Sequence, residues 1–339
     1  MSGSSLDGLD MALCDFRDEH HFTMLKSTCI PFSAEWIDRL EHFDSLDLHG
    51  MCQLEADFTK FLASQVIEFI GEDAINYIAS HGHTLVHSPT DGYSYQLGQG
   101  AYIAAHTGIP VISEFRLQDI AKGGQGAPIA PVVETFLFPD YDAYLNLGGI
   151  CNISIHDAGA VTAYDIGPCN QLLNALARLI GQDYDKGGQL ASQGVVLQQL
   201  LHKSLAHPFY AQPHPKSLDN SYVMKEFVTP ILLSEDSVED RLRTSTALIS
   251  KIINDAIPDG VSSVLATGGG AHNTFLIESL RAATSSRGIS IIIPDKEVID
   301  YKEAILMALM GYLRVNNIPN VYCSVTGASS DTISGAIYL

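Results

Sequence analysis

Acidic side chains outnumber basic ones by 39 to 19 in this chain of 339 residues, so the formal net charge is −20. A surface this acidic repels nucleic acid and anionic membranes, and we exclude both as main partners. A nucleotide remains compatible with the charge, because a small phosphate site can be built from backbone amides and a few cations.

Composition and length predict a soluble protein of two domains, since hydrophobic residues make up 46% of the chain. No apolar run approaches the roughly 20 residues of a membrane helix and no signal peptide opens the sequence, so we expect a cytoplasmic location. The six cysteines show no metal-ligand spacing, which predicts reduced thiols. The histidines at 81, 83 and 87 lack a nearby carboxylate, so no metal site is predicted there.

The chain opens with a turn. Asp7-Gly8 is a strong hairpin signal, and apolar and polar residues alternate from Leu9 to Cys14, so a strand leaves this turn. The strand that should enter the turn is missing or starts at Met1.

Helices and buried strands then alternate. Helical spacing covers residues 34–43 and 54–70, and a buried strand over 75–80 runs into polar residues. Residues 95–107 are predicted to form a helix that ends at Gly108.

The loop over residues 114–126 is rich in charged residues and glycine. Glu114, Arg116 and Asp119 place three charges within six residues, and three glycines surround Gln125. A solvated turn is one interpretation. A sugar's hydroxyl groups, however, need such partners: arginine donors, a carboxylate acceptor and an amide. We therefore predict that this loop contacts a sugar.

The central stretch, 143–170, carries the strongest pattern. It reads as a strand, a Gly148-Gly149 turn, a second strand, and a third strand that carries Asp165 to a Gly-Pro corner, after which a helix begins. Glycine lacks a Cβ, so this turn lets backbone N–H groups approach an anionic ligand. An ordinary hairpin turn is the alternative interpretation.

A further junction between a strand and a glycine turn lies late in the chain. The strand over 264–266 is followed by three consecutive glycines, Gly268, Gly269 and Gly270. The next helix starts after an Asn273 cap, a geometry that accepts a nucleotide's phosphate or base. Helix 302–316 then carries Glu303 in its first turn. In that position a glutamate is most often explained by its favourable interaction with the helix dipole alone.

Known nucleotide motifs are absent, since the chain has neither GxGxxG nor GxxxxGK[ST]. Two glycine hairpins, at 2–8 and 147–152, lie about half the chain apart, as expected if each opens one of two similar α/β domains. Facing each other across a cleft, the two turns would hold a polyphosphate, and residues 265–273 would hold the nucleoside.

Nine motifs run through nearly the whole chain in a characteristic order. They are MSGSSLDGLD, residues 82–87, EFRLQDIAKGGQGAPIAP, LNLGGICNIS, DIGPCN, PKS at 215–217, LATGGGAHN, YKEA and VTGAS at 325–329. This order resembles the anhydro-N-acetylmuramic acid kinases, a family of the actin, heat-shock chaperone and sugar kinase superfamily. The MSGSSLDG opening and GGQGAP are specific to the family, whereas NLGG and TGGG occur across the superfamily.

The resemblance implies a bacterial enzyme of peptidoglycan recycling that uses ATP and Mg²⁺. It would open 1,6-anhydro-N-acetylmuramic acid with water and phosphorylate O6, giving N-acetylmuramic acid 6-phosphate and ADP. The implied fold is α/β, with two similar actin-like ATPase (ribonuclease H-like) domains around a central cleft. Their expected ranges are 1–120, completed by a helix near 302–316, and 121–339. The family and the small residues near Gly311 also imply a homodimer.

The resemblance also implies roles for individual residues. Asp165 matches the general base, and Glu303 matches a glutamate near the reacting groups. The ATP contacts would be Gly3, Ser4, Ser5, Asp7, Gly8, Asp10, Gly148, Gly149, Gly268, Gly269 and Gly270. The sugar contacts would be His87, Arg116, Asp119 and Gln125. No metal ligand is assigned, because Mg²⁺ would arrive with ATP.

The chain departs from the family pattern in four places. Glu114 replaces an aspartate, residues 219–221 replace a Gly-Arg-Glu type sequence, and Ser330 replaces an arginine. A kinase for another 1,6-anhydrosugar is therefore one alternative, and an inactive nucleotide-binding relative is another. The family also has a complete strand before the opening motif, and without it we expect a more mobile first phosphate loop and weaker ATP binding.

Overall fold

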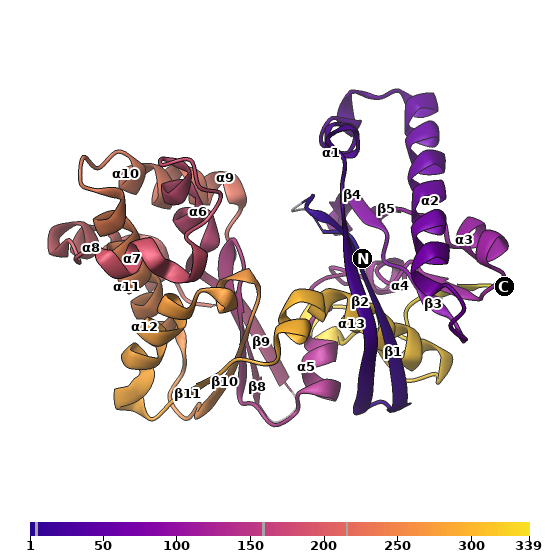
Figure 1. The fold of residues 1–339 in the computed structure, drawn as a ribbon. Helices are drawn as coiled ribbons and strands as arrows, with labels where there is room; N and C mark the ends of the chain where they lie inside the picture. The colour runs from indigo at the N-terminus through magenta and orange to yellow at the C-terminus, as the bar shows by residue number, and fades with distance from the viewer. Residues whose placement is uncertain (4–5, 158–159, 215) are drawn as a thin grey trace. The chain divides into compact units, whose positions relative to one another are not determined.

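The computed structural model describes residues 1–3, 6–157, 160–214 and 216–339. Ser4 and Ser5, two of the expected ATP contacts, lie outside the described residues. The protein is a mixed α/β chain, as predicted. Contacts divide it into two units, Met1–Pro139 together with Tyr301–Leu339, and Asp140–Asp300 (Figure 1).

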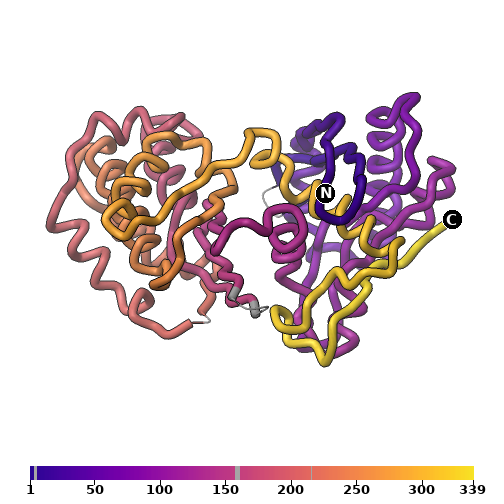
Figure 2. Tube along the Cα trace, turned by 90° about the horizontal axis from the view of Figure 1, so that it is seen from below, coloured from indigo at the N-terminus to yellow at the C-terminus, as the bar shows by residue number. Residues whose placement is uncertain are grey.

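The unit boundary differs from the expected one after residue 120. Ile129, Val132 and Val133 share one buried core with Ile305 and Met310, so the chain up to Pro139 belongs with the C-terminal segment. Figure 2 shows that segment, in yellow, lying among the first 139 residues. The predicted range 121–339 therefore does not form one compact unit.

The first unit combines short sheets with covering helices. Its elements are β1 (Gly8–Asp18), β2 (His21–Pro31), α1 (Ala34–Glu41), α2 (Leu48–Ile70), β3 (Ile78–Ala79), β4 (His83–Ser88), β5 (Tyr93–Leu97), α3 (Gly100–Thr107), β6 (Val111–Ser113), α4 (Leu117–Ala121), α5 (Pro131–Leu137), most of α13 (Lys296–Val315), α14 (Cys323–Thr326) and β12 (Ala336–Tyr338). Strands β1 and β2 form a long antiparallel hairpin, β12, β6 and β3 form a second sheet, and β4 pairs with β5.

Helix α2 covers the predicted residues 54–70 and begins six residues earlier. Asp47 caps it by accepting from the backbone N–H of Gly50, and Gly71 ends it with φ of 60°. Its apolar stripe, which includes Leu54, Phe58 and Leu62, is buried because these residues recur every three or four positions.

The predicted helix 95–107 is only half right. Tyr93–Leu97 forms strand β5, because its alternating burial suits a hairpin with β4. The hydroxyl of Tyr95 also donates to the carboxylate of Glu55 at 2.7 Å. The helix itself begins only at Gly100.

The small-residue face of α13 serves the first unit and is no evidence for a dimer. A Cβ added at Gly311 would lie 2.8 Å from the Cβ of Ala79 and 3.4 Å from the side chain of Ile112. The glycine is therefore needed so that α13 can approach strands β3 and β6. The small residues near Gly311 therefore give no support to the expected homodimer.

The second unit is built on one five-stranded sheet of order β11-β10-β7-β8-β9. Its elements are β7 (Ala143–Leu147), β8 (Ile150–Asp157), β9 (Ala160–Pro168), α6 (Asn170–Arg178), α7 (Gln189–Gln193), α8 (Gln198–Leu205), α9 (Asn220–Val223), α10 (Thr229–Leu232), α11 (Val238–Ala256), β10 (Ser263–Thr267), α12 (Thr274–Thr284) and β11 (Ser290–Ile292). Strand β10 runs parallel to β7 and β11, whereas β8 and β9 form an antiparallel meander with β7.

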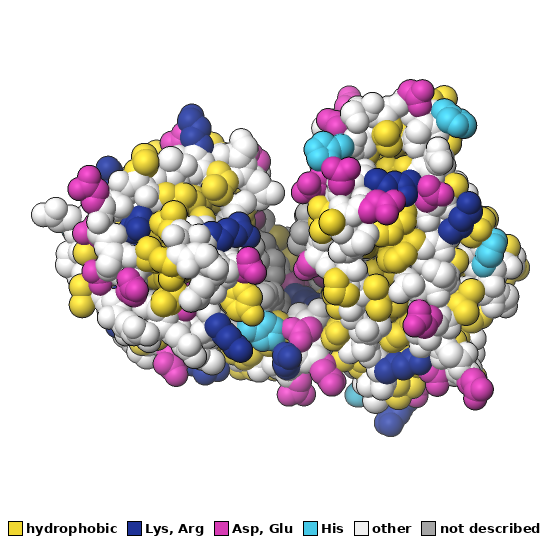
Figure 3. Space-filling model, turned by 45° about the horizontal axis from the view of Figure 1, so that its top comes forward, with side chains coloured by type: hydrophobic (Ala, Val, Ile, Leu, Met, Phe, Trp, Pro, Cys, Tyr) yellow, Lys and Arg dark blue, Asp and Glu magenta, His cyan; other side chains and the backbone are white. Residues whose placement is uncertain are grey.

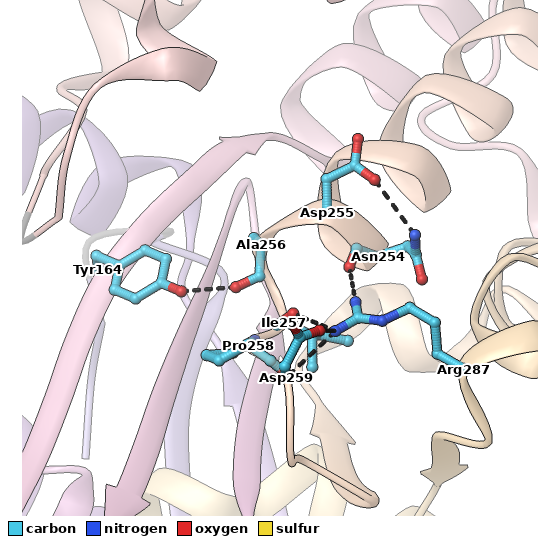
Figure 4. Close-up of polar contacts among 8 residues, drawn as sticks. All are labelled: Tyr164, Asn254, Asp255, Ala256, Ile257, Pro258, Asp259 and Arg287. Atoms are coloured by element: carbon cyan, nitrogen blue, oxygen red, sulfur yellow. Dashed lines mark hydrogen bonds and ion pairs between the residues drawn. The ribbon is translucent and has the colours of Figure 1, made fainter.

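The side chain of Arg287 caps the C-terminal end of the long helix α11. Its guanidinium donates to the carbonyl of Asn254, to those of Ile257 and Pro258 at 2.8 and 3.1 Å, and to the carboxylate of Asp259 (Figure 4). Beside it, the hydroxyl of Tyr164 on β9 donates to Ala256 at 2.7 Å. These bonds satisfy helix-end carbonyl groups and tie α11 to the sheet.

The described surface mixes both charges. On the face drawn in Figure 3, Lys and Arg side chains lie apart from one another among Asp and Glu. In the part of the chain that the structure describes, no helix is long and apolar enough to cross a membrane.

Candidate functional site

In the second unit, polar residues form a row across four strands. Thr267 of β10 pairs with Asn146 of β7, Asn146 pairs with Asn152 of β8, and Asn152 pairs with Asp165 of β9. On β7 and β10 the row lies at the carboxyl ends of neighbouring parallel strands, where open α/β sheets hold ligands.

The Gly148-Gly149 turn joins β7 to β8 and also anchors helix α6. The carbonyl of Gly148 accepts from Asn170 at 3.1 Å, and that of Gly149 accepts from Cys169 at 2.9 Å. Within the described residues, neither glycine N–H donates to another protein group. The turn therefore keeps its backbone donors available at the edge of the sheet.

The second glycine turn packs directly against the end of β7, just before the first turn. A Cβ added at Gly268 would lie 2.5 Å from Oδ1 of Asn146, and one at Gly270 would lie 2.8 Å from the Cβ of Leu147. Such distances exclude any side chain at either position. The fold thus brings Asn146 and Leu147 together with residues 268–270, although about 120 residues separate them, because β7 and β10 are parallel neighbours.

Asp165 lies beside this pair of turns on β9 and is held on two sides. Its backbone N–H donates to the carbonyl of Lys216, and its Oδ2 accepts from the N–H of Leu218 at 2.8 Å. No hydrogen bond to Oδ1 is found within the described residues. The carboxyl is half-buried, and burial raises the pKa of Asp165 above its usual value while the Leu218 bond opposes that rise.

Lys216, a candidate phosphate contact by sequence, is used within the protein. Its ammonium donates to the carbonyls of Phe209 and Tyr210 at 3.0 and 3.3 Å and lies over the Phe209 ring. It therefore holds the loop that carries Leu218, and burial lowers the pKa of this lysine.

In the first unit, carboxylates gather around the start of the chain. The charges of Asp10 and Asp7 raise the pKa of Glu303, although burial is the larger cause. Glu303 is nevertheless exposed to solvent, so a ligand can reach its carboxyl. The carbonyl of Gly3 accepts from the N–H of Leu6 at 3.3 Å.

Gly8 is required by the β1–β2 hairpin. A Cβ there would lie 2.5 Å from the carbonyl oxygen of Ile30. This glycine therefore serves the packing of the two strands, whatever else the loop binds.

Arg116 is the centre of the predicted sugar loop. It donates from Nε to Nε2 of His81 at 3.0 Å and from its terminal nitrogen to the carbonyl of Gly126 at 2.7 Å. The charge of Arg116 also lowers the pKa of His87, after burial, while the backbone of Gln125 opposes this. Three of the four predicted sugar residues, Arg116, His87 and Gln125, are thus neighbours, and both His87 and Gln125 are exposed.

The prediction that Asp119 contacts the sugar is wrong. Its side chain is 0% exposed, and its two oxygens accept from the N–H of Gly126 and the hydroxyl of Thr326, each at 2.7 Å. A Cβ at Gly124 would lie 2.2 Å from Oδ2 of Asp119. Asp119 therefore stabilises the conformation of the glycine loop from its buried side.

Glu114, which departs from the family pattern, is held at the C-terminal strand. Its Oε1 accepts from the Tyr338 hydroxyl at 2.6 Å, and its φ is 63°, in the left-handed region. This backbone conformation is uncommon for a residue with a side chain, and it fixes the start of the Arg116 loop.

Sequence reasoning missed two residues that position this loop. His81 is buried, and burial together with Arg116 lowers its pKa to about 3, so its Nε2 is an acceptor for the arginine. Thr326, which holds Asp119, lies in the VTGAS motif. The VTGAS motif marks Thr326 as a residue of interest in the sequence. The motif alone does not reveal, however, that its hydroxyl binds Asp119, because 207 residues separate the two.

A family profile described as anhydro-N-acetylmuramic acid kinase matches residues 1–339. The chain belongs to the anhydro-N-acetylmuramic acid kinase family. An anhydro-N-acetylmuramic acid kinase from Nitrosospira multiformis is 34% identical over 360 residues, covering 100% of this chain and 97% of that protein. One from a Sulfurovum species is 35% identical over 362 residues, covering 100% and 98%.

A solved structure is much more distant than these relatives. A ROK family glucokinase from Streptomyces griseus, in complex with glucose and AMPPNP, has a TM-score of 0.36 and 12% identity, with 84% of this chain and 90% of that chain covered. A TM-score this low supports no inference here, so the family assignment depends on the sequence matches.

Membership of a kinase family makes Mg²⁺ relevant to the site. No three metal-ligating side chains converge within the described residues. Magnesium at nucleotide sites usually takes only one or two carboxylates in addition to phosphate and water. Asp10 and Glu303 are two carboxylates whose charges interact, since Asp10 raises the pKa of Glu303 after burial, while the Met1 ammonium and Lys302 oppose this rise.

Proposed function

We propose that this chain uses ATP and water to convert 1,6-anhydro-N-acetylmuramic acid into N-acetylmuramic acid 6-phosphate and ADP. The proposal depends on one observation above all. Asp165 has a half-buried carboxyl whose Oδ2 accepts from Leu218, while no hydrogen bond to Oδ1 is found within the described residues, and it lies in the same unit as two glycine turns that meet at the end of β7. A binding module would need the turns but not this carboxylate.

In the proposed reaction, Asp165 acts as general base. It takes a proton from a water that attacks the anomeric carbon, on the face opposite the bridging oxygen. The C1–O6 bond breaks as the new C1–O bond forms, as in an inverting glycosidase. Oδ2 stays bound to Leu218, so Oδ1 is the oxygen that accepts the proton.

The departing O6 attacks the γ-phosphoryl group of ATP and so needs no separate strong acid. We assign the free N–H groups of Gly148 and Gly149 to phosphate oxygens, since amides preorganised at that position stabilise the transferring group. The 268–270 turn, where no side chain fits, would let the adenosine lie against the backbone. Mg²⁺, when bound, would neutralise phosphate charge during transfer.

In the first unit, the opening loop is the second proposed phosphate contact, through Gly3, Asp7, Gly8 and Asp10, with Glu303 near the reacting groups. Arg116, His87 and Gln125 are the proposed sugar contacts. Their support is that the arginine is oriented by His81 and Gly126 while its neighbours remain exposed.

A coupled assay for ADP release tests the substrate. We expect release with 1,6-anhydro-N-acetylmuramic acid and ATP, with much less for levoglucosan and for N-acetylmuramic acid. Mass spectrometry should find a product heavier than the substrate by one water and one phosphoryl group. Faster release with levoglucosan would replace the substrate assignment, and no release with any sugar would favour the inactive relative.

The stereochemistry tests the base. Attack opposite the bridge inverts the anomeric carbon, so proton NMR during the first turnovers should show the α-anomer before mutarotation mixes the two. Initial formation of the β-anomer would contradict an inverting role for Asp165.

A further inference from the structure

The first turn of helix α6 carries a glutamine that contacts two other segments. The backbone N–H of Gln171 donates to the carbonyl of Gly149 at 3.1 Å, so this residue lies next to the glycine turn between β7 and β8. Its side chain donates from Nε2 to Oδ1 of Asn220 at 3.0 Å. Gln171 therefore joins the glycine turn to the segment that follows Lys216.

The segment 216–220 is the one that holds Asp165. The carbonyl of Lys216 accepts from the backbone N–H of Asp165 at 2.9 Å, and the N–H of Leu218 donates to its Oδ2 at 2.8 Å. Asn220 follows Leu218 by only two residues, and two residues span at most about 7 Å. A displacement of Asn220 is therefore transmitted to Leu218.

Little buried surface holds this segment in place. Ser217 and Asp219 are exposed, and Leu218 is only half-buried. A backbone with few apolar contacts opens easily, so its position depends on its hydrogen bonds. At the start of the segment these bonds come from the ammonium of Lys216, and at its end the bond from Gln171 ties it to α6.

Packing alone does not explain a glutamine at position 171. Its Oε1 is buried and accepts no hydrogen bond within the described residues, and an unpaired buried acceptor costs folding free energy. If the amide were turned over, Nε2 would be buried without a partner instead. An apolar side chain of the same length would avoid this cost. The amide supplies one contact that such a side chain would lack, the bond to Asn220.

We propose that Gln171 is a positioning residue for Asp165. By holding Asn220, it keeps the N–H of Leu218 in place to donate to Oδ2. This role depends on the proposed function of Asp165 as the base. The Leu218 bond lowers the pKa of Asp165 against the larger effect of burial, because it favours the ionised carboxylate. The same bond keeps Oδ2 engaged, so Oδ1 remains the oxygen available to a water.

Gln171→Met tests this role, because methionine is a flexible side chain of similar length without a hydrogen-bonding amide. Two quantities are measured without ATP or a sugar: amide hydrogen exchange at Leu218, and the pKa of Asp165 from carbon-13 NMR of its carboxyl group. We expect exchange at Leu218 to become faster by about threefold or more and the pKa of Asp165 to rise. The acid limb of kcat/KM should then move to higher pH by the same amount, since more of the base is protonated at a given pH.

Stability separates this role from a general loss of structure. Gln171→Met removes a buried acceptor that has no partner within the described residues, so the melting temperature should stay the same or rise. Gln182→Met, an exposed change in the same unit, is the matched control. It should alter neither the exchange at Leu218 nor the pKa of Asp165.

Variants of Asn220 test the partner. Asn220→Leu removes the acceptor of the bond and should speed exchange at Leu218 as Gln171→Met does. Asn220→Asp keeps an acceptor and should keep the slow exchange of the parent chain. The double variant Gln171→Met/Asn220→Leu should exchange no faster than either single variant, because both changes remove the same bond.

Unchanged exchange at Leu218 and an unchanged pKa of Asp165 in Gln171→Met would overturn the role of Gln171. Additive effects in the double variant would do the same, as would a lower melting temperature with faster exchange throughout the unit. A raised pKa of Asp165 without a matching shift in kcat/KM would instead remove Asp165 as the base. The failure of this proposal is therefore distinguishable from the failure of the proposed reaction.

Discussion

The backbone N–H of Leu218 donates to Oδ2 of Asp165 at 2.8 Å and so binds the loop after residue 216 to strand β9. Lys216 anchors that loop on carbonyl groups and also accepts from the backbone of Asp165. The position of the proposed base therefore depends on a loop about 50 residues away in sequence. One oxygen of its carboxylate, Oδ2, is already hydrogen-bonded within the protein when no substrate is bound.

Replacing Asp165 with asparagine should lower turnover by on the order of a hundredfold or more and leave ATP affinity almost unchanged. The amide oxygen can still accept from Leu218, so the loop stays in place while the base is lost. Steady-state ADP release and calorimetric ATP binding measure the two effects. Asp183→Asn, an exposed change in the same unit, serves as control, and near-normal turnover of Asp165→Asn would refute its role.

The pH profile should carry the signature of a raised pKa. Asp165 acts only when ionised, and burial raises its pKa, so kcat/KM should fall as pH falls through a value above the usual aspartate value of about 3.9. Ionised Asp165 also costs stability in the folded state. Asp165→Asn should therefore melt at a higher temperature than the parent at pH 7, and this difference should disappear as pH falls through the folded and then the unfolded pKa. An acid limb at the ordinary aspartate position would count against this assignment.

Gly268→Ala should weaken ATP binding at least tenfold, because its Cβ would lie 2.5 Å from Oδ1 of Asn146 and so disturb the paired glycine turns. Gly260→Ala is a matched control, since its φ of 94° is similar to the 84° of Gly268 but nothing lies within 4 Å of its Cβ. Calorimetry with ATP, alongside melting curves, separates lost binding from general strain. Equal losses in both variants would mean that backbone strain, not the contact with β7, limits position 268.

Asp119→Ala should destabilise the protein by about 2 to 4 kcal/mol, because it leaves a cavity and strands two buried donors, the Gly126 N–H and the Thr326 hydroxyl. Denaturant unfolding measures this change, and the exposed Glu72→Ala in the same unit is the control. The Michaelis constant for the sugar should rise as the loop around Arg116 loosens. Normal stability with lost sugar binding would return Asp119 to the role of a direct contact.

Local patterns in the sequence were sufficient for many elements. Helices α2 and α6 appear where apolar spacing predicts them, because one face of each is buried, although α2 begins six residues before its predicted start. The prediction failed at β5, where aromatic residues at alternate positions pair with β4. A segment of five residues fits a helical period as readily as a strand, so its pattern alone does not show that it pairs with the neighbouring strand.

By itself, the sequence determined the family, the glycine turns and the acidic residues that chemistry at a sugar and a phosphate requires, since these are properties of residue type and order. Only the tertiary structure decided that Asp119 is buried beneath its loop and that the turn at 268–270 packs against Asn146 and Leu147 at the end of β7. Each of these depends on contacts between segments distant in the chain. Burial and backbone pairing follow from which segments become neighbours, and a single sequence does not state that.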